Sequence, residues 1–116
     1  PMEIAQIEMW YSRISFELMM PLMHGFRHTH PHMSQLENQN NEFGIAQREL
    51  AIKSLRHYDE VIANKDFISC NKFTYADIQM VTSLKFLVRL NKIDISDYSN
   101  LDSYINNIAS RPSFTA

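Results

Sequence analysis

Histidines gather in one short stretch of the chain, where they could bind a metal ion. Four of the five, His24, His28, His30 and His32, lie within nine residues. His24 and His28 are four positions apart, which places two imidazoles on one helix face, as in some zinc sites. No carboxylate or thiol stands at ligand spacing nearby, and two of the four flank Pro31 in a loop. We therefore predict no metal site and expect His28 to cap the carbonyls ending its helix, where the dipole favours a cation.

Asp77 invites a catalytic interpretation, because it is an acid close to two aromatic residues, Phe73 and Tyr75. A capping box explains it better: Thr74 can accept a hydrogen bond from the Asp77 amide, while the Asp77 carboxylate accepts one from the Thr74 amide. Phe73, just before the cap, and Ile78, in the helix, have the spacing of a hydrophobic staple. We therefore expect Phe73, Thr74, Asp77 and Ile78 to fix the start of a helix.

The single cysteine, Cys70, is a further candidate for chemistry, as a redox thiol. Lys72 is the only basic residue immediately beside it, and no second cysteine could resolve an oxidised thiol. We expect an inert, partly buried thiol. A lone cysteine also rules out an internal disulfide, which favours a reducing cytoplasm as the compartment.

The elements that position these residues are expected to be helices within one domain, residues 1–116. The chain of 116 residues has only two glycines, too few for the hairpins of an all-β domain or for a glycine-rich phosphate loop. Apolar residues recur at three- and four-residue spacing, which is typical of amphipathic helices. The predicted helices cover residues 2–28, 43–63, 75–91 and 101–110, with a polar loop over residues 30–42.

Several residues indicate how these helices bend, start and end. Pro21 lacks the amide that would bond the Glu17 carbonyl, so we expect a kink between these two residues. Ser99 and Asp102 form a weaker capping box for the last helix, and Pro112 would stop it. The third helix has apolar residues on nearly every side, which predicts that it is buried. The expected fold class is all-α, a bundle of four to five helices around that buried central helix.

Charge and hydropathy argue against two kinds of partner. The net charge is −2 with both signs scattered, so the basic patch of a nucleic-acid binder is missing. The longest apolar run, residues 18–23, is six residues long and contains a proline, far short of a membrane span. The sequence contains no basic lead followed by an apolar block, so we expect no signal peptide. We predict no nucleic-acid partner and no membrane insertion.

The residues that punctuate the helices form a longer pattern. It comprises Phe67-Ile68, Phe73-Thr74-Tyr75-Ala76-Asp77-Ile78, Tyr98, Asn100-Leu101, Tyr104, Ile108 and Arg111-Pro112, and in the first helix Trp10, Arg13 and Phe26-Arg27-His28-Thr29-His30-Pro31. Along essentially the whole chain this pattern resembles the C-terminal helical domain of the cytosolic glutathione S-transferases. In that family the capping box begins a buried sixth helix. The residues of the first helix are similar to a bacterial subgroup.

The resemblance implies a two-domain parent enzyme. A thioredoxin-like domain would bind glutathione as co-substrate and activate its thiol, and no βαβ pattern of that kind precedes Met2. The present chain would supply one wall of the site for an electrophilic, hydrophobic co-substrate and part of a homodimer interface. It would hold no catalytic residue, bind no cofactor alone and be inactive alone. The alternative is a non-catalytic interaction module, because translation-factor subunits and assembly domains reuse this fold.

The resemblance also implies which side chains face the co-substrate. In these enzymes the C-terminal half of the first long helix does so, which here corresponds to Leu22, Met23, Phe26, Arg27 and His30. Methionine and phenylalanine side chains suit an adaptable apolar pocket. The alternative is that Met23 and Phe26 are core residues, or are exposed because the first domain is missing.

The N-terminal half of the same helix helps to form the two-fold interface in the family. This assigns Met9, Arg13, Phe16 and Glu17 to a dimer interface or to contacts with glutathione across subunits. Arg13 and Glu17 are also four positions apart, so an ion pair on one solvated helix face is the more economical alternative.

Two residues depart from the family pattern. Cys70 stands where the family usually has glycine, and Tyr75 where it usually has isoleucine or leucine. If this turn needs a positive φ angle, Asn71 is the residue best suited to supply it after glycine.

Overall fold

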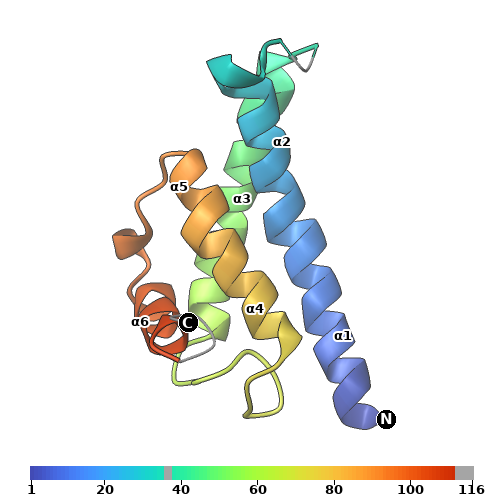
Figure 1. The fold of residues 1–116 in the computed structure, drawn as a ribbon, viewed down its shortest axis with the longest axis vertical. Helices are drawn as coiled ribbons and strands as arrows, with labels where there is room; N and C mark the ends of the chain where they lie inside the picture. Colours follow the sequence, from blue (N-terminus) through green and yellow to red (C-terminus); the bar gives the residue numbers. More distant parts are fainter. Residues whose placement is uncertain (36–37, 112–116) are drawn as a thin grey trace.

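Helices make up the framework of the chain. The computed structural model describes residues 1–35 and 38–111, and within them every regular element is helical, which confirms the predicted all-α class. The helices are α1 (Met2–Ile14), α2 (Met20–Thr29), α3 (Asn41–Val61), α4 (Tyr75–Thr82), α5 (Val88–Leu90) and α6 (Ser99–Ala109). Figure 1 shows α1 and α2 forming one long helix, α3 running back beside it, and the shorter helices on one side. None of the described helices is long and apolar enough to span a membrane.

A π-helical segment, Ser15–Met19, joins α1 to α2. The Met20 amide donates to the Ser15 carbonyl, five residues back, so the helix widens in the turn just before Pro21. A proline ring collides with the carbonyl four residues before it in a regular α-helix, and a wider turn relieves that collision. The helix is therefore irregular at the predicted place, between Glu17 and Pro21. The irregularity is a wide turn in a gently curved helix and not a sharp kink (Figure 1).

The helix α3 starts two residues earlier than predicted, because Asn40 caps it. The Asn40 side chain accepts a hydrogen bond of 3.0 Å from the Phe43 amide. The first turn of α3 then lies very close to the end of α2: a Cβ atom added at Gly44 would come within 2.7 Å of Thr29 Cγ2 and 2.9 Å of His28 Cβ. Glycine is therefore the residue that allows these two helices to touch.

The predicted third helix is built of α4, a π-helical segment (Ser83–Leu87) and α5. It ends in a Schellman motif, in which the Ile93 amide donates to the Val88 carbonyl at 3.1 Å and the Lys92 amide to the Arg89 carbonyl at 2.9 Å. Lys92 has a φ angle of 56°, in the left-handed region where this motif usually places glycine. A lysine therefore occupies a glycine-type position.

The start of α6 differs from the prediction. Ser99 is already the first residue of the helix, so the capping box expected from Ser99 and Asp102 is wrong. Asp59 of α3 provides the cap from across the bundle, because its Oδ1 accepts a hydrogen bond of 3.0 Å from the Leu101 amide. The predicted stop at Pro112 lies outside the described residues.

The helix formed by α4 and α5 lies in the core, as predicted, but one of its faces is open. Ile78 and Leu90 are each 45% exposed and Phe86 is 63% exposed. The prediction that this helix is buried on nearly every side is therefore wrong, because no described element covers this apolar stripe. Buried core residues come from all the long helices and include Ile14, Leu18, Leu22, Leu55, Tyr58, Ile62, Met80, Val81, Val88, Leu101 and Ile108.

Candidate functional site

Asp77 lies at the start of α4 and is fully buried. Its Oδ2 accepts a hydrogen bond of 3.0 Å from the Thr74 amide, and its Oδ1 accepts bonds of 2.9 Å from the Ile68 amide and 2.6 Å from the Tyr104 hydroxyl. Burial raises the pKa of Tyr104, and the Asp77 carboxylate raises it further. A carboxylate enclosed by three donors stabilises the fold and presents no oxygen to a substrate.

The rest of the capping box is looser. Thr74 and Asp77 occupy the two capping-box positions, but the Thr74 hydroxyl is buried without a well-aligned partner among the described residues. The capping box predicted for Thr74 and Asp77 is nevertheless present, and the Asp77 amide also donates to the Thr74 carbonyl at 3.0 Å. Phe73 packs against the core and Ile78 is exposed, so their staple contact stays a prediction.

A compact polar cluster occupies the middle of the long helix, next to α3. Arg13 Nε donates to Glu17 Oε1 at 2.6 Å, which raises the pKa of the guanidinium, and Arg13 Nη2 lies 3.1 Å from Nε2 of His57. The guanidinium carbon also lies 4.9 Å from the centre of the Trp10 ring. Burial raises the pKa of Tyr58, and the nearby Glu17 carboxylate raises it further. The ion pair within the helix is present, and His57 is a partner that the sequence did not reveal.

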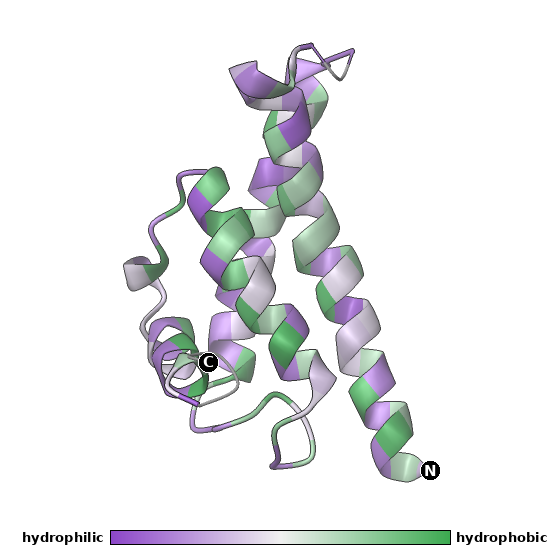
Figure 2. Cartoon of the chain, viewed as in Figure 1, coloured by the Kyte–Doolittle hydropathy of each residue, from purple (hydrophilic) through white to green (hydrophobic). Residues whose placement is uncertain are grey.

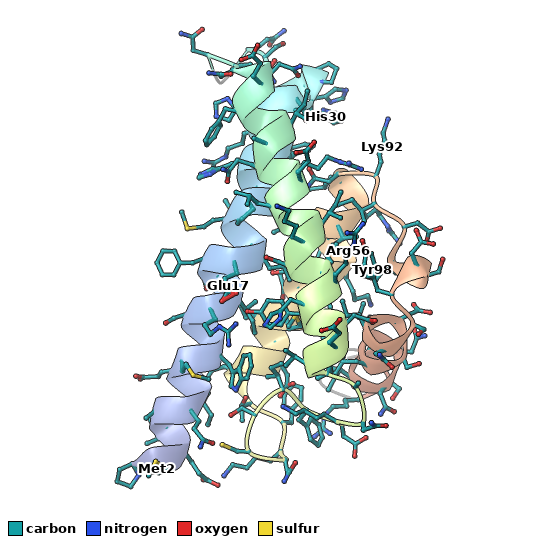
Figure 3. All side chains as sticks on the ribbon, turned by 180° about the vertical axis from the view of Figure 1, so that it is seen from behind. Met2, Glu17, His30, Arg56, Lys92 and Tyr98 are labelled. Atoms are coloured by element: carbon teal, nitrogen blue, oxygen red, sulfur yellow. The ribbon has the colours of Figure 1, made fainter. Side chains whose placement is uncertain are left out.

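Apolar side chains surround this cluster on the outside of the molecule. Phe16 is 69% exposed, and Met9 and Met20 on the same helix and Leu50 on α3 are exposed too. Glu17 lies on the side of the long helix that faces α3 (Figure 3). A shallow hollow of about 310 Å³ runs between the two helices, lined by Phe16, Glu17, Pro21, Leu50, Lys53, Ser54 and His57.

The C-terminal end of α2 forms a second candidate surface, with the turn after α5. Phe26 and His30 stack with ring centres 4.6 Å apart, and both line a small hollow of about 170 Å³. Arg48 and Lys92 bring positive charge to the same hollow. Hydrophilic residues dominate this end of the bundle in Figure 2. Two of the five residues expected to face a co-substrate are therefore brought together here.

The other three expected residues lie elsewhere on α2. Leu22 has no exposed surface, and its carbonyl accepts a hydrogen bond of 2.9 Å from Asn91 Nδ2 in the turn after α5. Leu22 therefore belongs to the core and cannot touch a ligand in this arrangement. Met23 and Arg27 are half-buried and do not line the hollow of Phe26 and His30.

His28 does not cap the end of α2 as expected. Gln39 Nε2 donates to the carbonyls of Arg27 at 2.9 Å and His30 at 2.7 Å, so a side-chain amide from the following connection caps α2. His28 Nδ1 instead accepts a hydrogen bond of 3.0 Å from the Asn40 amide, so the prediction that His28 caps the carbonyls is wrong. Among the described residues, no three His, Cys, Asp or Glu side chains are grouped to hold a metal ion.

Cys70 is half-buried, as expected, and sits in a strained turn. Its thiol lies 3.5 Å from Oε1 of Gln6 on α1. Cys70 and Asn71 have φ angles of 59° and 52°, so both adopt the left-handed region. The expectation that Asn71 supplies a positive φ is confirmed, and Cys70 adopts one as well.

The fold defines a class of protein. It is an all-α domain in which one long helix and its antiparallel partner pack against a capped central helix, and apolar faces of the long and central helices are left open. The sequence matches the family described as "Glutathione S-transferase, C-terminal domain" over residues 11–112. The chain therefore belongs to that family.

Individual proteins similar to this chain in sequence or in structure are also glutathione S-transferases or contain such a domain. Glutathione S-transferase 2 of Saccharomyces cerevisiae is 27% identical over 115 residues, which are 97% of this chain and 49% of that protein. The crystal structure of Gtt2 from the same yeast superposes with a TM-score of 0.88 at 25% identity, over 99% of this chain and 56% of that one. A glutathione S-transferase domain-containing protein of Marinobacter aquaeolei gives a TM-score of 0.85 at 28% identity, over 98% and 57%. The chain thus spans about half the length of its relatives.

Proposed function

We propose that this chain is the helical half of a glutathione transferase, whose whole chain joins glutathione to electrophilic, apolar co-substrates. The observation that carries this proposal is the family match over residues 11–112, together with a relative named a transferase that is about twice as long. The remaining, N-terminal half of such a protein leaves room for a thioredoxin-like domain that binds glutathione. The names of the relatives favour a transferase over a non-catalytic interaction module. The lone cysteine supports a cytoplasmic location.

In this proposal the domain shapes one wall of the co-substrate site. Phe26 and His30 offer stacked rings at the end of α2, and Met23 adds a flexible apolar side chain one turn earlier. Arg48 and Lys92, which line the same hollow as the two rings, attract the electron-rich groups of a polarised electrophile. Arg27 stays a proposed contact. These residues bind and orient, while thiol activation belongs to the other domain.

The open apolar stripe is the surface on which we place the thioredoxin-like domain. Ile78 of α4, Phe86 of the π-helical segment and Leu90 of α5 form its part on the central helix. Tyr11 of α1 is also exposed, and its ring packs against Tyr75 with centres 5.4 Å apart, so the stripe continues across both helices. An apolar face of this extent is typical of a surface that another domain covers.

A second exposed apolar face supports the proposed homodimer. It contains Met9, Phe16 and Leu50 around the ion pair of Arg13 and Glu17. An apolar face with charged residues within it has the composition of a protein interface. A two-fold axis near Phe16 would place the same hollow on both subunits, which is how an isologous dimer pairs its surfaces.

The test uses the whole protein with glutathione and 1-chloro-2,4-dinitrobenzene. We expect glutathione-dependent turnover, followed by absorbance of the conjugate, and none from residues 1–116 alone. The variant Phe26→Ala should raise the KM for the electrophile and leave the KM for glutathione unchanged, because Phe26 is placed at the electrophile's wall. Phe43→Ala, which removes an exposed phenylalanine outside that hollow, is the matched control. A whole protein without glutathione-dependent turnover would refute the transferase proposal.

A further inference from the structure

A buried amide, the side chain of Asn91, joins the end of α5 to α2. Asn91 is 8% exposed, and its Nδ2 donates hydrogen bonds of 2.9 Å to the Leu22 carbonyl and 2.8 Å to the Leu87 carbonyl. Asn91 and Leu22 are 69 positions apart in the sequence, so their bond is a contact between distant segments. Breaking either bond would leave a buried polar group without a partner, so the amide holds the two helices in one arrangement.

The backbone at Asn91 positions further residues of the hollow of Phe26 and His30. Arg48 Nε on α3 donates a hydrogen bond of 3.3 Å to the Asn91 carbonyl. Lys92 follows Asn91 directly, and Arg48 and Lys92 both line that hollow. Figure 3 shows His30 and Lys92 at the same end of the bundle. The end of α5 is thus tied to α2 by the side chain of one residue and to α3 by its carbonyl.

Gly25 on α2 leaves the space that the Asn91 amide occupies. A Cβ atom added at Gly25 would lie 3.1 Å from Asn91 Oδ1, which is closer than ordinary van der Waals contact. The next nearest atoms, the Gly44 carbonyl oxygen and Arg48 Cβ, would lie at the ordinary distances of 3.4 Å and 3.5 Å. A methyl group at this position would therefore press mainly on the amide.

We propose that Asn91, together with Gly25, is a positioning residue for the electrophilic co-substrate. The carbonyl that its amide holds belongs to Leu22, one helical turn before Phe26. Lys92 is its neighbour in the chain, so Asn91 sets the separation between the rings on α2 and the cations across the hollow. Groups that bind a ligand must be held to within about 0.5 Å of their productive places. The inference rests on the proposed transferase function.

The experiment measures steady-state kinetics of the whole protein with glutathione and 1-chloro-2,4-dinitrobenzene. The variant Asn91→Ala should raise the KM for the electrophile about fivefold, the factor that corresponds to losing one hydrogen bond. The KM for glutathione should stay within about twofold of wild type, because glutathione is held by the other domain. Loss of folded protein alone would lower the rate and leave both KM values unchanged. An unchanged KM for the electrophile would therefore overturn the positioning role.

Gln79→Ala is the matched control. Gln79 Nε2 donates a hydrogen bond of 2.7 Å to Ser15 Oγ, so this half-buried amide also joins the central helix to the long helix. Gln79 does not line the hollow of Phe26 and His30. We expect its KM for the electrophile to stay within about twofold of wild type. An equal rise in Gln79→Ala and Asn91→Ala would mean a general loosening of the domain and would contradict the proposal.

Gly25→Ala tests the same contact from the side of α2. The added methyl group should displace the amide and raise the KM for the electrophile, although alanine favours a helix. In the double variant Gly25→Ala/Asn91→Ala the methyl group meets no amide, so we expect no further rise over Asn91→Ala. Residues in contact show such non-additive effects. Additive effects in variants that thermal unfolding shows to be folded would contradict the proposed contact.

NMR of the isotope-labelled whole protein tests the arrangement without turnover. The His30 amide and the ring protons of Phe26 should shift in Asn91→Ala and keep their wild-type positions in Gln79→Ala. Unshifted signals in Asn91→Ala would overturn the inference even if the enzyme were inactive. A wild type without glutathione-dependent turnover would refute the transferase proposal, whereas an active wild type matched by Asn91→Ala in both KM values would refute the positioning role alone.

Discussion

The Tyr104 hydroxyl donates a hydrogen bond of 2.6 Å to Oδ1 of Asp77, although 27 positions separate the two residues in the sequence. The same oxygen accepts from the Ile68 amide, and the other carboxylate oxygen from the Thr74 amide. One buried carboxylate thus joins α6, the connection after α3 and the first turn of α4. Its removal should therefore affect the whole domain.

We expect Asp77→Ala to lower the free energy of unfolding by about 3 kcal/mol or more, because three buried donors lose their acceptor. Tyr104→Phe removes one of the three bonds and should cost about 1 kcal/mol. Urea unfolding followed by circular dichroism measures both. If Asp77→Ala unfolds at the same urea concentration as wild type, the carboxylate is not a structural cap.

Stability should fall at alkaline pH because of two tyrosines. Burial is the main cause that raises the pKa of Tyr58 and Tyr104 above the ordinary value of 10.0. The folded state holds these phenol protons more tightly than the unfolded state, so their contribution is complete below a pH of about 10 and is lost as pH rises further. In the double variant Tyr58→Phe/Tyr104→Phe, the free energy of unfolding measured with urea should fall less steeply above a pH of about 10 than in wild type. If the free energy of unfolding falls equally steeply with pH in both proteins, the two tyrosines are not the cause of the alkaline loss.

Two substitutions to glycine should stabilise the protein. Cys70 and Lys92 have positive φ angles of 59° and 56°, which cost a non-glycine residue about 1–2 kcal/mol each. Part of that gain is offset by the greater freedom of glycine in the unfolded chain, so we expect Cys70→Gly and Lys92→Gly each to add up to about 1 kcal/mol. Lys85→Gly, within the helix, should instead cost about 1 kcal/mol. Calorimetric melting of the three variants provides the comparison, and a lower melting temperature for Cys70→Gly and Lys92→Gly would contradict it.

The proposed dimer can be tested at Phe16. Sedimentation equilibrium should give a dimer for wild type at micromolar concentration and a monomer for Phe16→Glu, because a charge in the middle of an apolar interface is costly to bury. Ser103→Glu, an exposed change on α6, is the control and should remain dimeric. A wild-type protein that stays monomeric at high micromolar concentration would exclude this interface.

The sequence predicted local features well, because their signals lie within a few residues. The helices, the box of Thr74 and Asp77, and the disturbance beside Pro21 all depend on contacts between near neighbours. It did not predict that Asp59 caps α6 or that Gln39 caps α2, because no fixed spacing links a side chain to an amide across the bundle. The three apolar side chains left exposed on the central helix, Ile78, Phe86 and Leu90, also have the pattern of core residues in the sequence, since hydropathy does not say which face of a helix lacks a neighbour.

The turn at Lys92 was missed for a different reason. The usual sign of a Schellman motif is glycine after the last helical residue, and a lysine there carries no such signal. Among the candidate site residues, Phe26 and His30 meet in one hollow, while Leu22 is turned into the core on the same helix. Leu22 and Phe26 are four positions apart on one side of α2, so what separates them is which neighbouring residues cover each, and the sequence pattern does not give that information.

That segment also sets the rotational phase of the long helix. A π-helical turn holds one residue more than an α-helical turn, and one residue corresponds to roughly 100° of rotation. Deleting a single residue from Ser15–Met19 would therefore turn α2 about its axis relative to α1, carry Phe26 away from the turn at Lys92, and bring Gly25 out of its buried position. The extra residue therefore sets the rotational alignment of α1 relative to α2.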